Sequence, residues 1–130
     1  MSNTPTTAPI HLSAALIVKN EAAKLEACLQ SIAGWVDEIV IVDSGSSDAT
    51  LEIAQKYGAK VYSHTDWQGF GMQRQRAQYH VQGAWVMWLD ADERVTPELK
   101  QSLQAALNQY RDQQNVIFEF NRYSWAFGKF

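Results

Sequence analysis

The sequence predicts an α/β fold with a mostly parallel sheet and helices on both faces of that sheet. Short apolar runs rich in β-branched residues alternate with longer segments of helical periodicity over most of the chain. A helix that connects two such strands usually forms a parallel crossover, which places the strands side by side in one sheet. The length of 130 residues corresponds to one domain, and the 46% of hydrophobic residues can supply its core.

The predicted strands are short and mostly apolar. The second reads Glu-Ile-Val-Ile-Val, and the fourth reads Ala-Trp-Val-Met-Trp-Leu, a continuous apolar run typical of a strand buried on both faces. In chain order the five predicted strands cover residues 12–18, 38–42, 60–63, 84–89 and 115–120.

Four helices are predicted between these strands. The first covers residues 21–32 and carries its apolar side chains on one face. The second is capped by side-chain oxygens at 46–48 and ends at Gly58. The third covers 72–81. The fourth begins at Thr-Pro-Glu (96–98), which offers a cap, a proline at the first helical position and an acid near the positive end of the helix dipole.

The composition disfavours several function classes. The net charge is −3 and no basic stripe is present, which argues against nucleic acid as a partner. Cys28 is the one cysteine, so no internal disulfide can form, and we expect it to be a small buried hydrophobe.

No run of the sequence reaches the about 20 apolar residues of a membrane span. Residues 1–10 lack the features of a signal peptide. We expect a flexible tail over 1–11 and a cytoplasmic protein.

Aromatic residues gather at the carboxyl end of the sequence. An apolar segment without a partner would leave an adhesive surface. We therefore expect that the chain is truncated or that another chain covers this segment. The residues concerned are Phe118, Phe120, Tyr123, Trp125, Phe127 and Phe130.

Polar side chains follow three of the predicted strands. Asn20 and Glu21 follow the first, Asp43 follows the second, and Asp90 and Asp92 follow the fourth. In an open α/β sheet these loops converge on one crevice. Clustered carboxylates suit Mg²⁺ or Mn²⁺, and such an ion in turn suits a pyrophosphate. The alternative for Asp-Ala-Asp taken alone is a solvated turn.

Other polar residues near these strand ends have two interpretations each. Asp43 ends an apolar strand, where a carboxylate needs a hydrogen-bond donor such as the N–H of a nucleobase. Asp48, in the same loop, is expected only to cap a helix. Arg74 and Arg76 either face a phosphate or a base, or lie on a solvated helix face. Residues 67–71 contain two glycines and two aromatics, and form either a flexible flap or a packing segment.

Several common motifs are absent from the sequence. The first turn, Val-Lys-Asn-Glu at 18–21, has no glycine-rich fingerprint, which argues against a dinucleotide-binding domain. Neither a P-loop nor a Gly-x-Ser-x-Gly nucleophile elbow is present. The three histidines, His11, His64 and His80, lack the spacing of metal ligands.

Three segments together resemble the inverting family 2 glycosyltransferases. They are Leu-Ile-Val-Lys-Asn-Glu at 16–21, Val-Asp-Ser-Gly-Ser-Ser-Asp-Ala-Thr at 42–50 and Trp-Leu-Asp-Ala-Asp-Glu at 88–93. The resemblance covers residues 12–120. The segments 69–75 and 121–129 are similar to a narrower branch, the bacterial lipopolysaccharide core β-glucosyltransferases.

The resemblance implies a GT-A fold that binds a nucleotide-diphosphate sugar. The implied domain covers 12–121, and 122–130 would begin an acceptor-side region that is missing here. A UDP-sugar, for which UDP-glucose is one candidate, would be the donor, with Mg²⁺ or Mn²⁺. The acceptor would be a glycan or a lipid-linked glycan, at the inner face of the cytoplasmic membrane. The resemblance also implies a role for each site residue. The nucleoside pocket would include Ile17, Val18, Asn20 and Glu21, and Asp43 would accept from the uracil N–H. Arg74 would contact the base or pyrophosphate, Asp90 would lie near the ribose and metal, and Asp92 would coordinate the metal.

An inverting transfer also needs a carboxylate base. In the family this base comes from the second half, and neither Glu93, beside the metal pair, nor Glu119, within a predicted strand, is a convincing candidate. A sugar-nucleotide-binding or interaction module without catalysis is therefore the alternative. A nucleotidyltransferase is disfavoured, because Val-Lys-Asn-Glu-Ala at 18–22 lacks a glycine- and lysine-rich phosphate loop.

Overall fold

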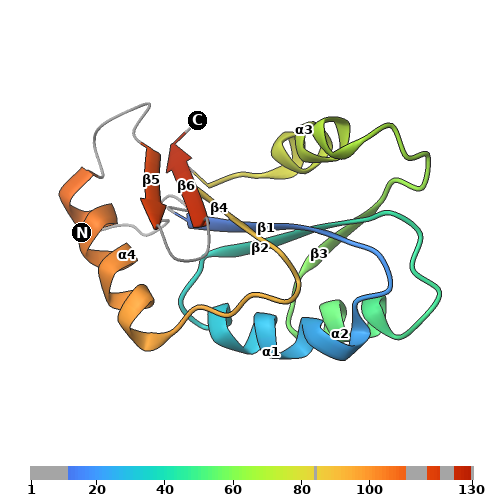
Figure 1. Ribbon diagram of the computed structural model, residues 1–130, viewed down its shortest axis with the longest axis horizontal. Helices are drawn as coiled ribbons and strands as arrows, with labels where there is room; N and C mark the ends of the chain where they lie inside the picture. Colours follow the sequence, from blue (N-terminus) through green and yellow to red (C-terminus); the bar gives the residue numbers. More distant parts are fainter. Residues whose placement is uncertain (1–11, 84, 111–116, 121–124, 130) are drawn as a thin grey trace, which may run out of the picture.

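The computed structural model describes residues 12–83, 85–110, 117–120 and 125–129 (Figure 1). Strands and helices alternate along the chain up to the last two strands. In chain order the elements are β1 Leu12–Val18, α1 Ala22–Ile32, β2 Glu38–Asp43, α2 Thr50–Lys56, β3 Lys60–Ser63, α3 Phe70–His80, β4 Trp85–Leu89, α4 Pro97–Tyr110, β5 Ile117–Phe120 and β6 Trp125–Lys129.

The strands form one mixed sheet in the order β3-β2-β1-β4-β6-β5. The pairs β1–β2, β1–β4 and β2–β3 are parallel, and β6 is antiparallel to both of its neighbours. Figure 1 shows α1 and α2 on one face of the sheet and α3 on the other, with α4 at the β5 end. The predicted α/β class, with a mostly parallel sheet covered on both faces, is confirmed.

The sequence pattern did not predict β6. Alternation of strand and helix implied a parallel crossover at every step, but only four residues lie between the end of β5 and the start of β6, too few for a crossover helix. Antiparallel strands need only such a short connection. As a result β6 lies between β4 and β5 in the sheet, within the stretch 122–130 that was expected to begin another region. The domain boundaries stay predictions, and the predicted tail 1–11 lies outside the described residues.

The core lies between β1, β2, β4 and the helices α1 and α4. All six residues of β2 are buried, and β1 is buried except for the partly exposed Ile17, as continuous apolar strands require when both faces of a sheet are covered. Among the residues whose burial the structure describes, Trp85 has the largest fully buried side chain. Of the helices in the described part of the chain, none combines the length and apolarity needed to cross a membrane.

Two predicted helix ends are confirmed by their hydrogen bonds. Thr96 Oγ1 accepts from the N–H of Leu99 at 3.1 Å, which caps α4. Gly58 follows α2 with φ of 75° and donates its N–H to the carbonyl of Gln55 at 3.0 Å. These contacts set the point at which the chain enters α4 and the point at which it leaves α2.

A buried carboxylate fixes the amino ends of the central strands. Glu38 is 6% exposed, and its Oε1 accepts from Ser13 Oγ at 2.6 Å and from the Gln82 N–H at 2.9 Å. Its Oε2 pairs with Lys60 Nζ at 2.9 Å. Burial raises the pKa of Glu38, but the bonds from Ser13, Gln82 and Lys60 outweigh burial and hold this pKa below its ordinary value. The network therefore ties β1, β2 and β3 to the turn after α3.

Glu38→Gln should lower the free energy of unfolding at pH 7 by about 1–3 kcal/mol, because an amide N–H₂ would face the Lys60 ammonium. The folded pKa lies below the ordinary 4.5, so the contribution of Glu38 is complete above that pH and is lost as the pH falls through the folded pKa. Urea unfolding of both proteins should show their difference shrinking below pH 4.5. Glu52→Gln, an exposed acid on α2, is the control and should change stability by less than about 0.5 kcal/mol. Equal stability of wild type and Glu38→Gln at pH 7 would contradict the assignment.

Candidate functional site

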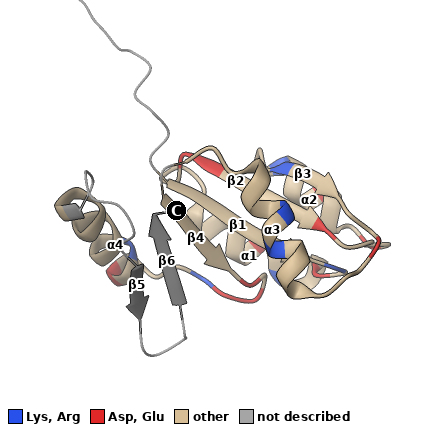
Figure 2. Ribbon diagram, turned by 90° about the horizontal axis from the view of Figure 1, so that it is seen from above, with Lys and Arg blue, Asp and Glu red and all other residues tan. Residues whose placement is uncertain are grey.

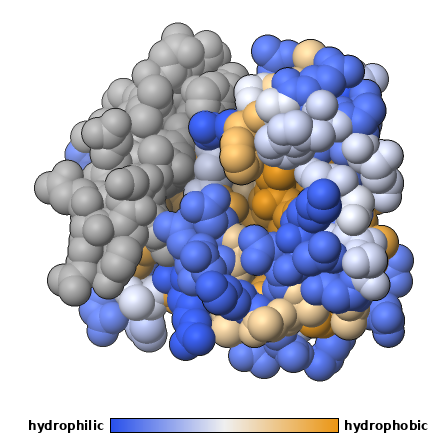
Figure 3. Space-filling view, turned by 45° about the vertical axis from the view of Figure 1, so that its right-hand side comes forward, coloured by the Kyte–Doolittle hydropathy of each residue, from blue (hydrophilic) through white to orange (hydrophobic). Residues whose placement is uncertain are grey.

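A cavity of about 410 Å³ lies at the carboxyl ends of β1 and β2. This volume is within the range of about 300–1,000 Å³ found for small-molecule sites. Figure 3, which brings this side of the molecule forward, shows apolar surface in the middle of the face with hydrophilic side chains around it. The cavity is lined by Ile17, Val18, Lys19, Glu21, Ser44, Thr65, Trp67 and Phe70.

A second cavity of about 420 Å³ lies at the opposite end of the sheet. Leu12 and Trp85, at the amino ends of β1 and β4, line it together with Leu107 of α4. Open α/β sheets bind their ligands at the carboxyl ends of the strands. The polar residues predicted from the sequence also lie at those ends, so we assign the candidate site to the first cavity.

Three of the four residues predicted for the nucleoside pocket, Ile17, Val18 and Glu21, line this cavity. Asn20 does not line it and instead connects two loops. It has φ of 53°, a left-handed conformation that asparagine tolerates better than most residues. Its Oδ1 accepts from the Ser47 N–H at 2.7 Å, and its own N–H donates to Ser46 Oγ at 2.9 Å.

Asp43 is paired within its own loop. Asp43 is 2% exposed, and its carboxylate accepts from the N–H of Gly45 at 3.1 Å and from the N–H and hydroxyl of Ser46. The hydrogen-bond donors that the Asp43 carboxylate was expected to need are therefore supplied by Gly45 and Ser46 of the same loop. The contact of Asp43 with a base stays a prediction, and the structure adds that this carboxylate shapes the β2–α2 loop.

The Asp48 side chain bonds the first residues of α1 and α2, although the N-cap residues of these helices are Glu21 and Ala49. Its Oδ1 accepts from the N–H and hydroxyl of Thr50, and its Oδ2 accepts from the Ala22 N–H at 3.3 Å. The bond from the Thr50 hydroxyl is the main cause that holds the pKa of Asp48 below its ordinary value. The Glu21 N–H donates to Thr50 Oγ1 at 2.9 Å. The β1–α1 turn and the β2–α2 loop are thus joined at several points.

The Asp-Ala-Asp segment forms a closed turn after β4. The Asp90 N–H donates to Glu93 Oε1 at 2.7 Å, and the Glu93 N–H donates to the Asp90 carbonyl at 3.0 Å. Ala91 and Val95 are buried in the core, whereas Asp90 and Asp92 are exposed. The alternation of buried and exposed residues turns both acidic residues toward solvent.

Helix α1 packs against this turn and is hydrogen-bonded to it. Cys28 is fully buried, as predicted, and its Sγ donates to the Asp90 carbonyl at 3.7 Å. The Val95 N–H donates to Ser31 Oγ at 2.9 Å. Burial, together with the nearby acids at 90–93, raises the pKa of the Cys28 thiol to about 12. The thiol is therefore neutral at physiological pH and acts as a weak donor.

The acidic turn suits a metal that is shared with a substrate. Among the described residues, no three His, Cys, Asp or Glu side chains lie close enough together to hold a metal ion. Mg²⁺ is usually held by one or two carboxylates together with waters and substrate phosphates. Two exposed carboxylates therefore fit an ion that binds jointly with a diphosphate, and do not fit a closed protein cage.

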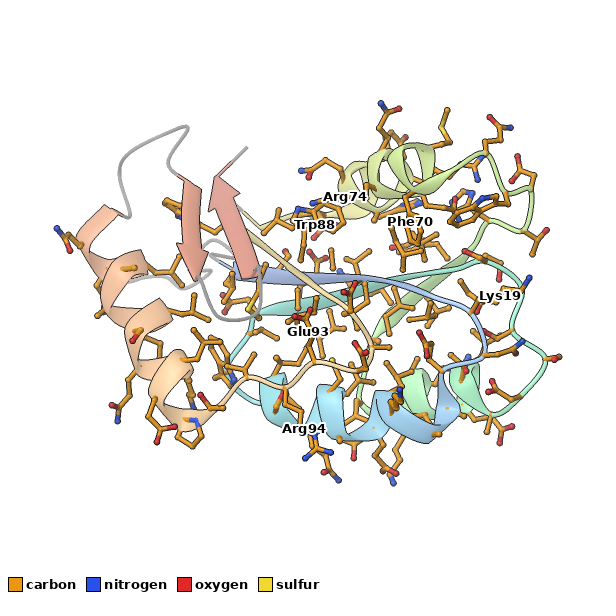
Figure 4. The ribbon with its side chains drawn as sticks, viewed as in Figure 1. Lys19, Phe70, Arg74, Trp88, Glu93 and Arg94 are labelled. Atoms are coloured by element: carbon orange, nitrogen blue, oxygen red, sulfur yellow. The ribbon has the colours of Figure 1, made fainter. Side chains whose placement is uncertain are left out.

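Arg74 lies over the strand that leads to this turn. Its guanidinium carbon is 4.5 Å from the centre of the Trp88 ring, a distance typical of a cation–π contact. Figure 4 shows Arg74 beside Trp88 on the α3 side of the sheet, whereas Arg94 lies on the α1 side. In Figure 2 the basic positions of α3 and the acidic segment after β4 both appear beside the sheet. The contact of Arg74 with a base or pyrophosphate stays a prediction.

Arg76, the other arginine of α3, is used within the protein. Its guanidinium pairs with the Asp66 carboxylate at 2.9 Å and donates to the Gln73 Oε1 at 2.7 Å. Gln73 is fully buried, and its Nε2 donates to Ser44 Oγ at 2.9 Å and to the His64 carbonyl at 3.0 Å. These bonds hold the loops after β2 and β3 against α3, so they frame the cavity.

Residues 13–128 match the protein family described as glycosyl transferase family 2. The chain belongs to this family. Sequence relatives include a Rickettsia bellii protein described as an uncharacterized glycosyltransferase, 38% identical over 103 residues, and the lipopolysaccharide core biosynthesis glycosyltransferase LpsC of Rhizobium meliloti, 38% identical over 96 residues. The match covers 77% and 71% of this chain, respectively, and 35% of each relative. The chain thus spans about a third of the length of these curated relatives.

Solved structures of GT-A glycosyltransferases share the fold of this family 2 chain. The Pyrobaculum calidifontis mannosyltransferase PcManGT, in complex with GDP-Man and Mn²⁺, has a TM-score of 0.72 at 20% identity, covering 95% of this chain and 45% of that one. Glucosyl-3-phosphoglycerate synthase of Mycobacterium tuberculosis, in complex with Mn²⁺, UDP and glucosyl-3-phosphoglycerate, has a TM-score of 0.60 at 21% identity, covering 92% and 57%. The predicted GT-A fold is confirmed.

Sequence reasoning missed several residues that line the cavity of this family 2 chain. Lys19 and Ser44 directly follow β1 and β2, so their place after a strand was an available signal. Thr65 follows the short strand β3, which was not used to predict a site. The buried amide of Gln73 was also missed, because nothing in a polar helix sequence shows which glutamine turns inward.

Gln73→Leu should lower the free energy of unfolding by about 1–3 kcal/mol, because the His64 carbonyl and the Arg76 guanidinium would each lose a buried partner. Gln75→Leu, at an exposed position of the same helix, is the matched control and should change stability by less than about 0.5 kcal/mol. Urea unfolding at pH 7 measures both. Equal effects of the two substitutions would show that the Gln73 bonds contribute nothing to stability.

Proposed function

We propose that this chain binds the nucleotide-diphosphate sugar of a family 2 glycosyltransferase. The donor is a UDP-sugar, with UDP-glucose as the first candidate, and it binds together with Mg²⁺ or Mn²⁺. The complete enzyme transfers the sugar with inversion to a glycan acceptor. One observation carries the proposal: within a family 2 sheet, a cavity of about 410 Å³ opens at the carboxyl ends of β1 and β2, and the acidic turn after β4 follows a strand paired directly with β1.

The residues around the cavity have separate roles in this proposal. Ile17 and Val18 contact the nucleoside at the end of β1, where they line the cavity. Asp90 and Asp92 hold the metal, because their carboxylates are exposed at the end of β4. When bound, the ion neutralises charge that develops on the departing nucleoside diphosphate. Arg74 adds a fixed positive charge on the α3 side, oriented by Trp88.

The nucleotide and the acceptor rest on sequence resemblance. The two solved neighbours described above carry GDP-Man in one case and UDP in the other, so the fold is compatible with either base. The choice of UDP follows from the resemblance to lipopolysaccharide core glucosyltransferases. LpsC, whose name refers to lipopolysaccharide core biosynthesis, supports a core glycan acceptor. Such an acceptor would place the enzyme in the cytoplasm, peripherally at the inner face of the membrane.

Asp92→Asn should abolish Mn²⁺-dependent binding of UDP, because the amide removes the negative charge that holds the ion. Isothermal titration calorimetry with UDP, in the presence and absence of Mn²⁺, measures this. Glu98→Gln removes an exposed carboxylate from the first turn of α4 and is the matched control, with unchanged affinity. If Asp92→Asn binds UDP with wild-type affinity in Mn²⁺, the metal assignment is wrong.

Arg74→Gln should weaken UDP binding about 10- to 100-fold, the effect of losing one charge-assisted hydrogen bond of about 1.5–3 kcal/mol. Arg94→Gln, an exposed arginine on the other side of the sheet, should leave the affinity unchanged (Figure 4). The same calorimetric titration compares both variants. Loss of affinity in both would indicate only a general effect of net charge.

Binding without transfer is the second candidate function. Glu93 is the acid next to the metal pair, and its Oε1 already accepts from the Asp90 N–H. This bond favours a structural role for Glu93 over a role as the base for an acceptor hydroxyl. Release of UDP from UDP-glucose, measured with and without a core oligosaccharide acceptor, separates the two functions. A binding module would release no UDP in either case.

A further inference from the structure

Two large aromatic side chains stand at the mouth of the cavity without being buried. Trp67 is 50% exposed and Phe70 is 67% exposed, and both line the cavity. Apolar side chains of this size normally lose most of their exposed area on folding. Exposed aromatics beside a concave site indicate a surface that a ligand covers.

The geometry of this pair suits a flat ligand. The ring centroids are 5.0 Å apart and the ring planes meet at 86°. Two rings at a right angle form a corner, so a planar heterocycle can stack on the face of one ring while its edge meets the other. The remaining lining residues include apolar Ile17 and Val18 and polar Glu21 and Ser44. A nucleobase has this combination of flat apolar faces and polar edges.

The loop that carries the pair is anchored without a ligand. The Asp66 carboxylate pairs with Arg76 at 2.9 Å, and the Asp66 carbonyl accepts from the same guanidinium at 3.2 Å. Gln73 donates to the His64 carbonyl at 3.0 Å. At the other end Gly69 has φ of 96°, a conformation that favours glycine, and its carbonyl begins α3 by accepting from the Gln73 N–H. These contacts hold the two rings at the rim of the cavity.

We infer that Trp67 and Phe70 form a stacking surface for the base of the nucleotide donor. The inference rests on the proposed function and adds to it the residues that contact the faces of the base. Stacking on aromatic side chains is tolerant of base identity, so this surface provides affinity. Discrimination between bases then depends on the polar groups at the edges of the cavity.

Trp67→Ala should weaken UDP binding in Mn²⁺ about 5- to 100-fold, the range measured for losing one base–aromatic stack. Trp67→Phe should restore most of the affinity, because it retains an aromatic face. The affinity for inorganic pyrophosphate with Mn²⁺, a probe without a base, should stay unchanged in both variants. Calorimetry on the 130-residue chain measures all of these values.

Tyr79→Ala is the matched control, because Tyr79 is 84% exposed on α3 and does not line the cavity. Phe70→Ala provides a second test at an exposed position should Trp67→Ala not fold. Unchanged UDP affinity in Trp67→Ala and Phe70→Ala would overturn the inference and leave the proposed function intact. Equal weakening of UDP and pyrophosphate would also overturn it. A wild-type chain that binds neither probe would overturn the proposed function, and the inference with it.

Discussion

The parallel pairing of β1 with β2 on one side and β4 on the other determines where the candidate site residues that follow these strands lie. In register, Val18 is opposite Asp43, and Leu16 is opposite Leu89, so the three strands end at the same edge of the sheet. Because β1 is almost wholly buried, a shift of register would expose core residues, and the pairing is strongly specified. The Asn20 turn, the Asp43 loop and the Asp90 turn therefore meet, although up to 70 residues separate them.

Hydrogen bonds between these loops then fix the shape of the site. Asn20 accepts from the loop after β2, Asp48 accepts from the start of α1, and Gln73 reaches from α3 to the loops after β2 and β3. The polar side chains that hold the loops together are thus different from most of those that face the cavity. This division leaves Lys19 and Glu21 at the cavity wall, whereas Ser44, which also lines the cavity, accepts from Gln73. Bonds of this kind restrict the loops before a ligand binds, and such restriction lowers the entropy cost of binding.

Hydrophobic periodicity predicted the parallel core and the helix ends of the fold, because burial and capping are local properties of the sequence. It failed at β6, since a strand that returns in the antiparallel direction is specified by its partners β4 and β5 and not by its own pattern. At the site, Ile17 and Val18 line a cavity at the strand end where the sequence placed the nucleoside pocket, and their contact with a nucleoside stays a prediction. The inward turn of Gln73 and the pairing of Asp43 within its own loop depend on tertiary neighbours, so the sequence alone could not reveal them.

The position of Cys28 behind the acidic turn means that reaction of its thiol would report opening of this turn. The thiol lies against the Asp90 carbonyl with no exposed surface, and its raised pKa keeps it protonated. Oxidants and alkylating agents react with an accessible thiolate, so neither can reach this sulfur while the turn is closed. Any reaction at Cys28 therefore requires a local opening in the region where α1 packs against the turn after β4. Because the sequence has one cysteine, a thiol-specific reagent would report the opening of this region alone.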